Sequence, residues 1–172
     1  FYNLNFFYNL NFFYAVILFG VIDSSIKMWH QVDLKKLIAY STVQEMNIIF
    51  LPLLNNTTTN IFVAAIFVIT HCFLSTLFFF IIDIMYKRYF SRTSVKISGV
   101  IHTTPIFGTF IFISLILFSG LPFTLKFFSE IFLYNIFLNF DLNSFLVLIF
   151  SCNLLGIIGF SKNFFNVMFG FS

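Results

Sequence analysis

Six apolar runs, each long enough to cross a lipid bilayer as a helix, are the feature that most constrains the fold of this sequence. A spanning helix needs about 20 mostly apolar residues to cross a hydrocarbon core of roughly 30 Å. Lipid offers backbone groups no hydrogen-bond partner, so a spanning segment must satisfy them internally. The sequence therefore predicts an all-α integral membrane protein with about six transmembrane helices. The expected segments are 12–29, 34–54, 60–86, 103–121, 122–140 and 143–168.

Composition supports this class and narrows the function. The chain is 60% hydrophobic and only 9% charged, whereas a soluble domain carries about 25% charged residues. A net charge of +3 is too small to suggest a nucleic-acid partner. Cys72 and Cys152 lie in separate apolar runs without metal-binding spacing, so we expect no disulfide framework and no metal site. No set of residues typical of a nucleophile, a phosphate-binding loop or a redox centre appears, and we expect no cofactor bound by this chain.

The first twelve residues are a tandem repeat, FYNLNF-FYNLNF. Tyrosine is enriched at membrane–water interfaces. We therefore interpret residues 1–11 as a low-complexity interfacial segment, followed by one transmembrane helical domain over residues 12–170.

The connections between segments indicate how the chain crosses the membrane. MWHQVDLKK, the first connection, is basic, and YKRYFSRTSVK, the third, carries several cations and no acid. Connections rich in lysine and arginine tend to lie on the cytoplasmic or matrix side of a membrane, so both are expected on that side. The connection NFDLN, between the last two segments, is acidic and breaks the pattern if every segment crosses fully. Either the charge rule is weak there or one segment is broken.

The stretch GLPFTLKFFSEIF, residues 120–132, contains the candidate break. Gly120 and Pro122 separate two apolar runs with no polar loop, and proline disrupts a continuing helix. A discontinuous helix or a very tight turn is expected here. Glu130 lies about 12 Å along a helix from Pro122, and Lys126 shares its face. One interpretation is a protonatable carboxylate in a polar channel, tuned by Lys126. The other is an ion pair near a helix end, with Lys126 extending outward to the headgroups.

Two further titratable residues lie within apolar segments. His71 is near the middle of the third segment and suits a proton relay, because imidazole titrates near neutrality. It could equally be a neutral side chain bonded to a neighbouring helix. Glu45 shares a polar face of the second segment with Ser41 and Gln44, and this face must point at protein or water.

The remaining charges have simpler explanations. Asp33 is the expected N-cap of the second segment, which begins with Lys35 and Lys36. These two lysines could anchor the helix in the headgroups, and we favour that role for Lys35. Acids and bases four residues apart are expected to pair on a helix, and Asp23 and Lys27 have this spacing. Asp83 is expected to pair with Lys87 or Arg88.

Four motifs in order resemble one family. They are VDLKKLIAYSTVQEMN (32–47), THCFLSTLFFFIIDIMYKRYFSRT (70–93), SGVIHTTPIFGTFIFISLILFSGLPFTLKFFSEIF (98–132) and SCNLLGIIGFSKNFFNVMFG (151–170). Over roughly residues 15–170 the chain resembles the C-terminal part of the subunit 4 family of NADH dehydrogenase. This is an antiporter-like membrane subunit of respiratory complex I. The related subunit 5 family typically has lysine where this chain has Glu130, and cation/proton antiporter subunits share the scaffold.

The resemblance implies a function. Such subunits translocate protons in the mitochondrial inner membrane or the bacterial plasma membrane, coupled to NADH oxidation and ubiquinone reduction elsewhere in the complex. NADH, FMN, iron–sulfur clusters and ubiquinone would belong to other subunits. Glu130 matches the family's exit-side protonatable residue, and His71 matches a relay histidine. Lys35 and Lys36 match the family's DLKK run at a helix start and, with Glu45 and Lys126, are further candidates for the proton relay. Other membrane-arm subunits and lipids are the implied partners.

The chain departs from the family pattern at three positions. Glu45 stands where the family usually has histidine, Lys126 where it has a small or polar residue, and Ser129 where it has glycine. An antiporter-like subunit pairs two inverted repeats, and this sequence corresponds to the second. We expect a separate chain or further sequence to supply the first repeat. The alternatives are a non-conducting scaffold half-subunit and a cation/proton antiporter subunit. Convergence of Glu130, His71 and Glu45 would favour translocation.

Overall fold

The computed structural model describes residues 4–54, 57–139 and 143–170, with side chains for 12–54, 57–138 and 145–170. The described chain is helical throughout its length apart from turns and short connections, which confirms the predicted all-α class. Its helices are α1 (Leu4–His30), α2 (Leu34–Leu53), α3 (Thr58–Tyr89), α4 (Val100–Thr103), α5 (Pro105–Phe118), α6 (Leu125–Asn139) and α7 (Asn143–Phe169).

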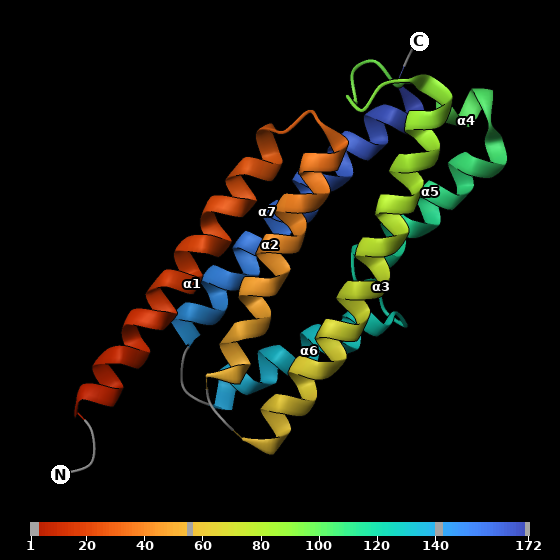
Figure 1. Cartoon of the computed structure of the whole chain (residues 1–172). Helices are drawn as coiled ribbons and strands as arrows, with labels where there is room; N and C mark the ends of the chain where they lie inside the picture. The colour runs from red at the N-terminus through yellow and green to blue at the C-terminus, as the bar shows by residue number, and fades with distance from the viewer. Residues whose placement is uncertain (1–3, 55–56, 140–142, 171–172) are drawn as a thin grey trace.

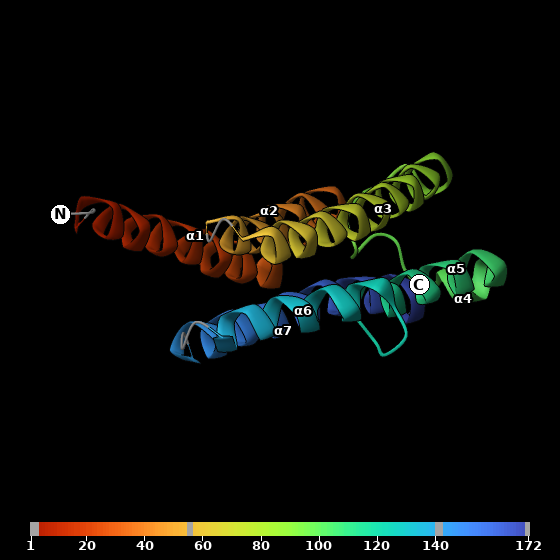
Figure 2. The same ribbon diagram turned by 90° about the horizontal axis from the view of Figure 1, so that it is seen from below.

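The helices form two layers. Figure 2 shows α1, α2 and α3 in one layer and α4 to α7 in the other. Within the first layer, α2 lies between α1 and α3 and contacts both. Between the layers, α7 packs against α1 and α2, while α3 packs against α5 and α6. The functional side chains described below lie where α2, α3, α6 and α7 meet.

The predicted discontinuous helix is present. Helices α5 and α6 have 14 and 15 residues, or about 21 and 22 Å each, too short to cross a core of roughly 30 Å alone. They follow one another end to end along α3 and α7 (Figure 1). The predicted segments 103–121 and 122–140 are therefore two halves of one passage. The described helices thus run along the bundle five times, and α5 and α6 together form the one discontinuous run that the sequence predicts.

The break between α5 and α6 depends on an unusual backbone. Gly120 and Phe123 have positive φ angles of 68° and 76°. A left-handed conformation costs glycine little but is unfavourable for other residues. Gly120 therefore allows the chain to leave α5 and start α6 without a long loop.

A single passage for α5 and α6 explains the charge pattern. The backbone N–H of Leu34 donates to Arg92 O and that of Ser94 donates to Val32 O, both at 3.0 Å. These bonds hold the first and third connections together, as predicted for loops on one side of the membrane. The C-terminal end of α6 and the start of α7 lie at the other end of the bundle (Figure 1). Of the two explanations for the acidic NFDLN connection, a broken segment is correct.

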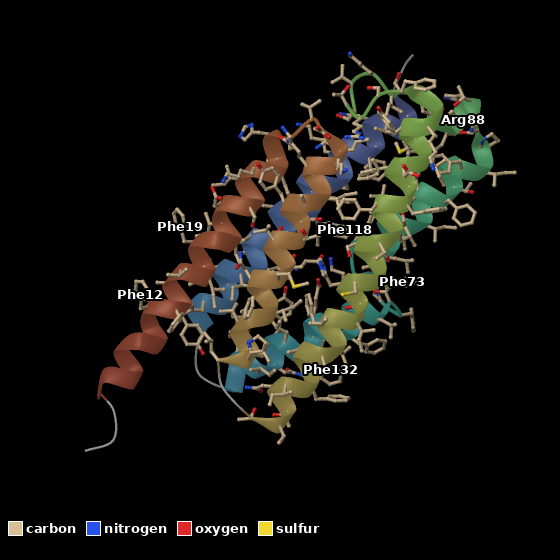
Figure 3. All side chains as sticks on the ribbon, in the orientation of Figure 1. Phe12, Phe19, Phe73, Arg88, Phe118 and Phe132 are labelled. Carbon is tan, nitrogen blue, oxygen red and sulfur yellow. The ribbon has the colours of Figure 1, made fainter. Side chains whose placement is uncertain are left out.

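The surface is suited to lipid. Three stretches are long and apolar enough to cross a membrane, namely Phe12–His30, Thr58–Tyr89 and Phe145–Phe169. Phe12 and Phe19 extend outward from α1 (Figure 3) and are 67% and 73% exposed. Helix α1 begins at Leu4, within the N-terminal repeat, and the interfacial placement of residues 1–11 stays a prediction. These features describe a membrane protein.

Two apolar clusters fill the interior, and a polar layer separates them. One cluster includes Leu37 of α2 and Phe78 of α3, and the other includes Ile48 of α2 and Phe67 of α3. The sequence between these positions on α2 contains the buried residues Ser41, Gln44 and Glu45, and that on α3 contains Thr70 and His71. The buried polar groups therefore gather at mid-height of the bundle.

Candidate functional site

Three titratable side chains from three helices meet at the polar layer. Glu45 of α2 lies with its Oε2 atom 2.6 Å from His71 Nδ1 of α3. The other oxygen of Glu45, Oε1, accepts a hydrogen bond from Lys126 Nζ of α6, also at 2.6 Å. The exposed fraction of each side chain is 6% or less. We call these three residues the buried triad.

Local sequence explains the position of Glu45. Asp33 caps α2, as predicted, by accepting a hydrogen bond from Lys35 N at 3.1 Å. From this start, Glu45 lies about 16 Å along the helix axis, which is half the thickness of a hydrocarbon core. The neighbouring side chain of Gln44 donates to Cys152 O of α7 at 3.0 Å. The polar face of α2 thus points into the protein, as expected.

Lys126 points inward, which corrects one of the two interpretations. Its side chain is 3% exposed, so it does not extend to the headgroups. It pairs with Glu45 and not with Glu130, although Glu130 lies four residues away on the same helix. The ammonium also lies 3.9 Å from the centre of the Phe118 ring at the end of α5. Helix α6 packs against α3, and the side chain of Lys126 in its first turn reaches Glu45 of α2 in the polar layer.

Glu130 lies one turn further along α6 and forms a second polar group. Its Oε1 atom accepts a hydrogen bond from Asn153 Nδ2 of α7 at 3.2 Å. The same amide donates to the hydroxyl of Tyr134 at 3.4 Å. A β-carbon added to Gly120 would lie 3.2 Å from the other carboxylate oxygen. Gly120 therefore both forms the turn and leaves room for Glu130.

A pocket of about 340 Å³ adjoins this second group. Its lining includes Gly120, Glu130, Tyr134 and Asn153. Most of its lining is apolar, but the polar groups of Glu130, Tyr134 and Asn153 face one part of it. A space of this size can hold water beside those groups. The pocket gives the carboxylate of Glu130 room for further partners.

The other predicted residues lie apart from the triad. Lys35 and Lys36 are exposed in the first turn of α2, about 14 Å or more from Glu45 along the helix axis. The predicted pairs form: Lys27 Nζ lies 2.5 Å from Asp23 Oδ2, and Lys87 Nζ lies 2.6 Å from Asp83 Oδ2. Both pairs are exposed.

Sequence reasoning missed two members of the Glu130 group. Asn153 and Tyr134 were not candidates. Asn153 did give a signal, because an amide in the apolar run SCNLLGIIGF needs a buried partner. Tyr134 gave none, since tyrosine is common in membrane helices and its partner lies on another helix.

The arrangement suits proton transfer. His71 Nδ1 and Glu45 Oε2 are at a separation across which a proton can pass in one step. Glu45 has a cation on one side and an imidazole on the other, so a change of charge on either partner alters its interactions directly. Among the described residues, no group of three His, Cys, Asp or Glu could hold a metal ion.

Comparison with known proteins points to one family. Residues 4–156 match the model of the NADH:quinone oxidoreductase/Mrp antiporter transmembrane family. The chain is 41% identical over 155 residues, 90% of its length, to NADH-ubiquinone oxidoreductase chain 4 of Paramecium tetraurelia, covering 33% of that protein. It is 31% identical to the chain 4 protein of Chondrus crispus over 66% of its length, and 31% identical to NADH-quinone oxidoreductase subunit M of Rickettsia typhi over 64%. These matches cover 23% and 22% of those two relatives, so the chain spans about a third or less of the curated relatives it matches.

Proposed function

Because this chain belongs to the NADH:quinone oxidoreductase/Mrp antiporter transmembrane family, we propose that it is a membrane-arm subunit of complex I that contributes to proton translocation. The observation that carries the proposal is the buried triad, in which the carboxylate of Glu45 binds His71 and Lys126 from three different helices. An ionisable cluster at membrane depth is costly to bury. A proton pathway gives this cluster a function.

In the proposed pathway a proton reaches Glu45 through His71. Protonation of Glu45 weakens its attraction for the ammonium of Lys126. Lysine has a long flexible stem, and Glu130 lies one turn away on the same face of α6. Lys126 can then turn toward Glu130 and change the charge that Glu130 faces. Glu130, held by Asn153, exchanges protons through the adjoining pocket.

The proposed setting is that of a complex I subunit, the kind of protein that the relatives are named as. The chain would be in the mitochondrial inner membrane, or in the plasma membrane if its source is bacterial. Its partners would be other membrane-arm subunits, the protein segment that supplies the rest of an antiporter-like subunit, and lipid. NADH oxidation and ubiquinone reduction would occur in other subunits, which would hold NADH, FMN, iron–sulfur clusters and ubiquinone. Lys35 and Lys36 would lie at the membrane surface on the positive side.

Proton pumping in sealed vesicles, driven by NADH oxidation, tests this function. Glu45→Gln and Glu130→Gln should each lower the number of protons moved per NADH oxidised, in complexes whose assembly is verified on a native gel. Asp83→Asn is the matched control, because Asp83 also pairs with a lysine but is exposed. Unchanged pumping in both glutamine variants would refute the proposed pathway.

One observation favours a second candidate, a scaffold half-subunit that conducts no protons. Every buried side-chain nitrogen and oxygen in the described residues has a hydrogen-bond partner, as a static structural network would require. Under this alternative, Glu45→Gln would reduce the yield of assembled complex, while the remaining complex would pump normally.

A further inference from the structure

A groove on the outer surface, between α3 and the α4–α5 segment, takes no part in the proposed pathway. It has a volume of about 690 Å³. On the α3 side, Leu77, Ile81, Ile84 and Arg88 line it. Their spacing places them on one helix face. The groove therefore follows one face of α3 from Leu77 to Arg88.

Polarity changes along this groove. Ile106 and Phe110 line the part along α5, whereas Thr103 and Thr104 line the end near Arg88. The hydroxyl of Thr103 lies 2.8 Å from that of Tyr89, the residue after Arg88. One end is thus polar and cationic, and the rest is apolar. Such a groove matches an amphiphile with an anionic head and a hydrocarbon tail.

Arg88 has a free guanidinium at this end. Its neighbour Lys87 pairs with Asp83, and Arg92 lies over the Tyr86 ring. Arg88 itself is exposed and makes no ion pair with any described residue. It lies near the end of α3 beside α4 (Figure 3). This end belongs to the cation-rich connection, where an anionic headgroup would be attracted.

The length of the groove fits one leaflet. Leu77 and Arg88 are about 16 Å apart along the helix axis, and half of a hydrocarbon core is about 15 Å. If Arg88 lies at the level of the headgroups, Leu77 lies near the middle of the bilayer. We propose that this groove binds one acyl chain of an anionic phospholipid, with the phosphate on Arg88.

Photolabelling of the assembled membrane protein tests the site. The protein is reconstituted in phosphatidylcholine vesicles containing a small fraction of phosphatidylglycerol with a photoreactive acyl chain. The phosphatidylglycerol probe should label peptides of α3 and α5 that line the groove more strongly than a phosphatidylcholine probe of the same chain. Arg88→Gln should lower this labelling by about fivefold, the factor that corresponds to about 1 kcal/mol for one basic side chain at an anionic surface.

Two further variants make the outcome decisive. Arg88→Lys keeps the charge and should retain most of the labelling. Arg92→Gln removes a cation that stacks on Tyr86 instead of lining the groove, and should have little effect. Equal labelling by the two probes, or by wild type and Arg88→Gln, would overturn the proposal. Absence of lipid labelling together with crosslinks from the groove to another protein segment would also overturn it, by showing a protein occupant.

Discussion

Glu45 and Lys126 are 81 residues apart in sequence, yet their side chains form an ion pair at 2.6 Å with only 6% and 3% of their surfaces exposed. The pair joins the polar face of α2 to the first turn of α6, just after the break in the α5–α6 passage. A buried carboxylate or ammonium without a partner is costly. The break in the α5–α6 passage therefore places Lys126 where it can pair with Glu45, and this pairing in turn stabilises the polar layer.

Removing one partner of this pair should destabilise the protein more than removing both. Lys126→Met leaves the buried carboxylate with only His71 and should cost about 3–5 kcal/mol, whereas adding Glu45→Gln should recover much of that loss. Thermal unfolding of the purified protein for both single variants and the double variant gives the coupling energy. Asp23→Asn and Lys27→Met, in an exposed pair, should couple by at most about 1 kcal/mol. Additive effects at Glu45 and Lys126 would contradict the pairing.

Much of the fold follows from local sequence. Apolar runs of helical length predicted the spanning segments, Asp33 predicted the start of α2, and Gly120 with Pro122 predicted the break. Local patterns left open whether the two runs around Gly120 were separate passages or halves of one. The acidic NFDLN connection distinguishes the two cases. Basic connections tend to lie on one side of the membrane, and only a single passage places this acidic connection on the other side.

The candidate site was only partly predictable, because its contacts are tertiary. Helical spacing placed Lys126 and Glu130 on one face, but spacing alone left open whether Lys126 pairs locally with Glu130. The actual partner, Glu45, comes from a helix whose position relative to α6 depends on packing. The role of Asn153 also depends on a neighbouring helix. Sequence thus identified the ionisable residues but could not assign all their partners.

Replacing His71 should separate proton transfer from simple hydrogen bonding. His71→Phe removes the partner of Glu45 Oε2 and should cost about 1–3 kcal/mol of stability. His71→Gln offers an amide donor, so it should recover part of the stability. An amide does not titrate, and pumping should remain low in both variants. The measurement is the number of protons pumped per NADH oxidised, with His102→Gln as the control because His102 is exposed. Normal pumping by His71→Gln would exclude His71 from the pathway.

Gly120→Ala should disturb both the turn and Glu130. The φ angle of 68° is unfavourable for alanine by about 1–2 kcal/mol. The new methyl group would also lie 3.2 Å from Glu130 Oε2 and should displace the carboxylate from Asn153. We expect lower thermal stability and reduced pumping. Ser119→Ala tests the same turn at a residue with an ordinary φ of −68° and should have little effect on pumping. A Gly120→Ala protein with unchanged stability and pumping would show that this turn tolerates a side chain.

Asn153→Leu should impair pumping through the loss of the hydrogen bond to Glu130. The substitution should cost about 1–2 kcal/mol, and pumping per NADH should fall because Glu130 loses its positioning contact. Asn153→Asp should be worse, since a second carboxylate would then face Glu130. Tyr134→Phe removes only the 3.4 Å contact and should be milder.

Asn163→Leu is the matched control for this prediction, because it separates stability from function. Asn163 is also a buried amide on α7, but its partners are Gly159 O and the hydroxyl of Ser94. Its loss should lower thermal stability by a similar amount, while the remaining assembled protein pumps normally. If Asn153→Leu and Asn163→Leu reduce pumping equally, the effect comes from general weakening of α7. A loss of pumping in Asn153→Leu that Asn163→Leu does not share would show that the Asn153 amide positions the carboxylate of Glu130 for proton transfer.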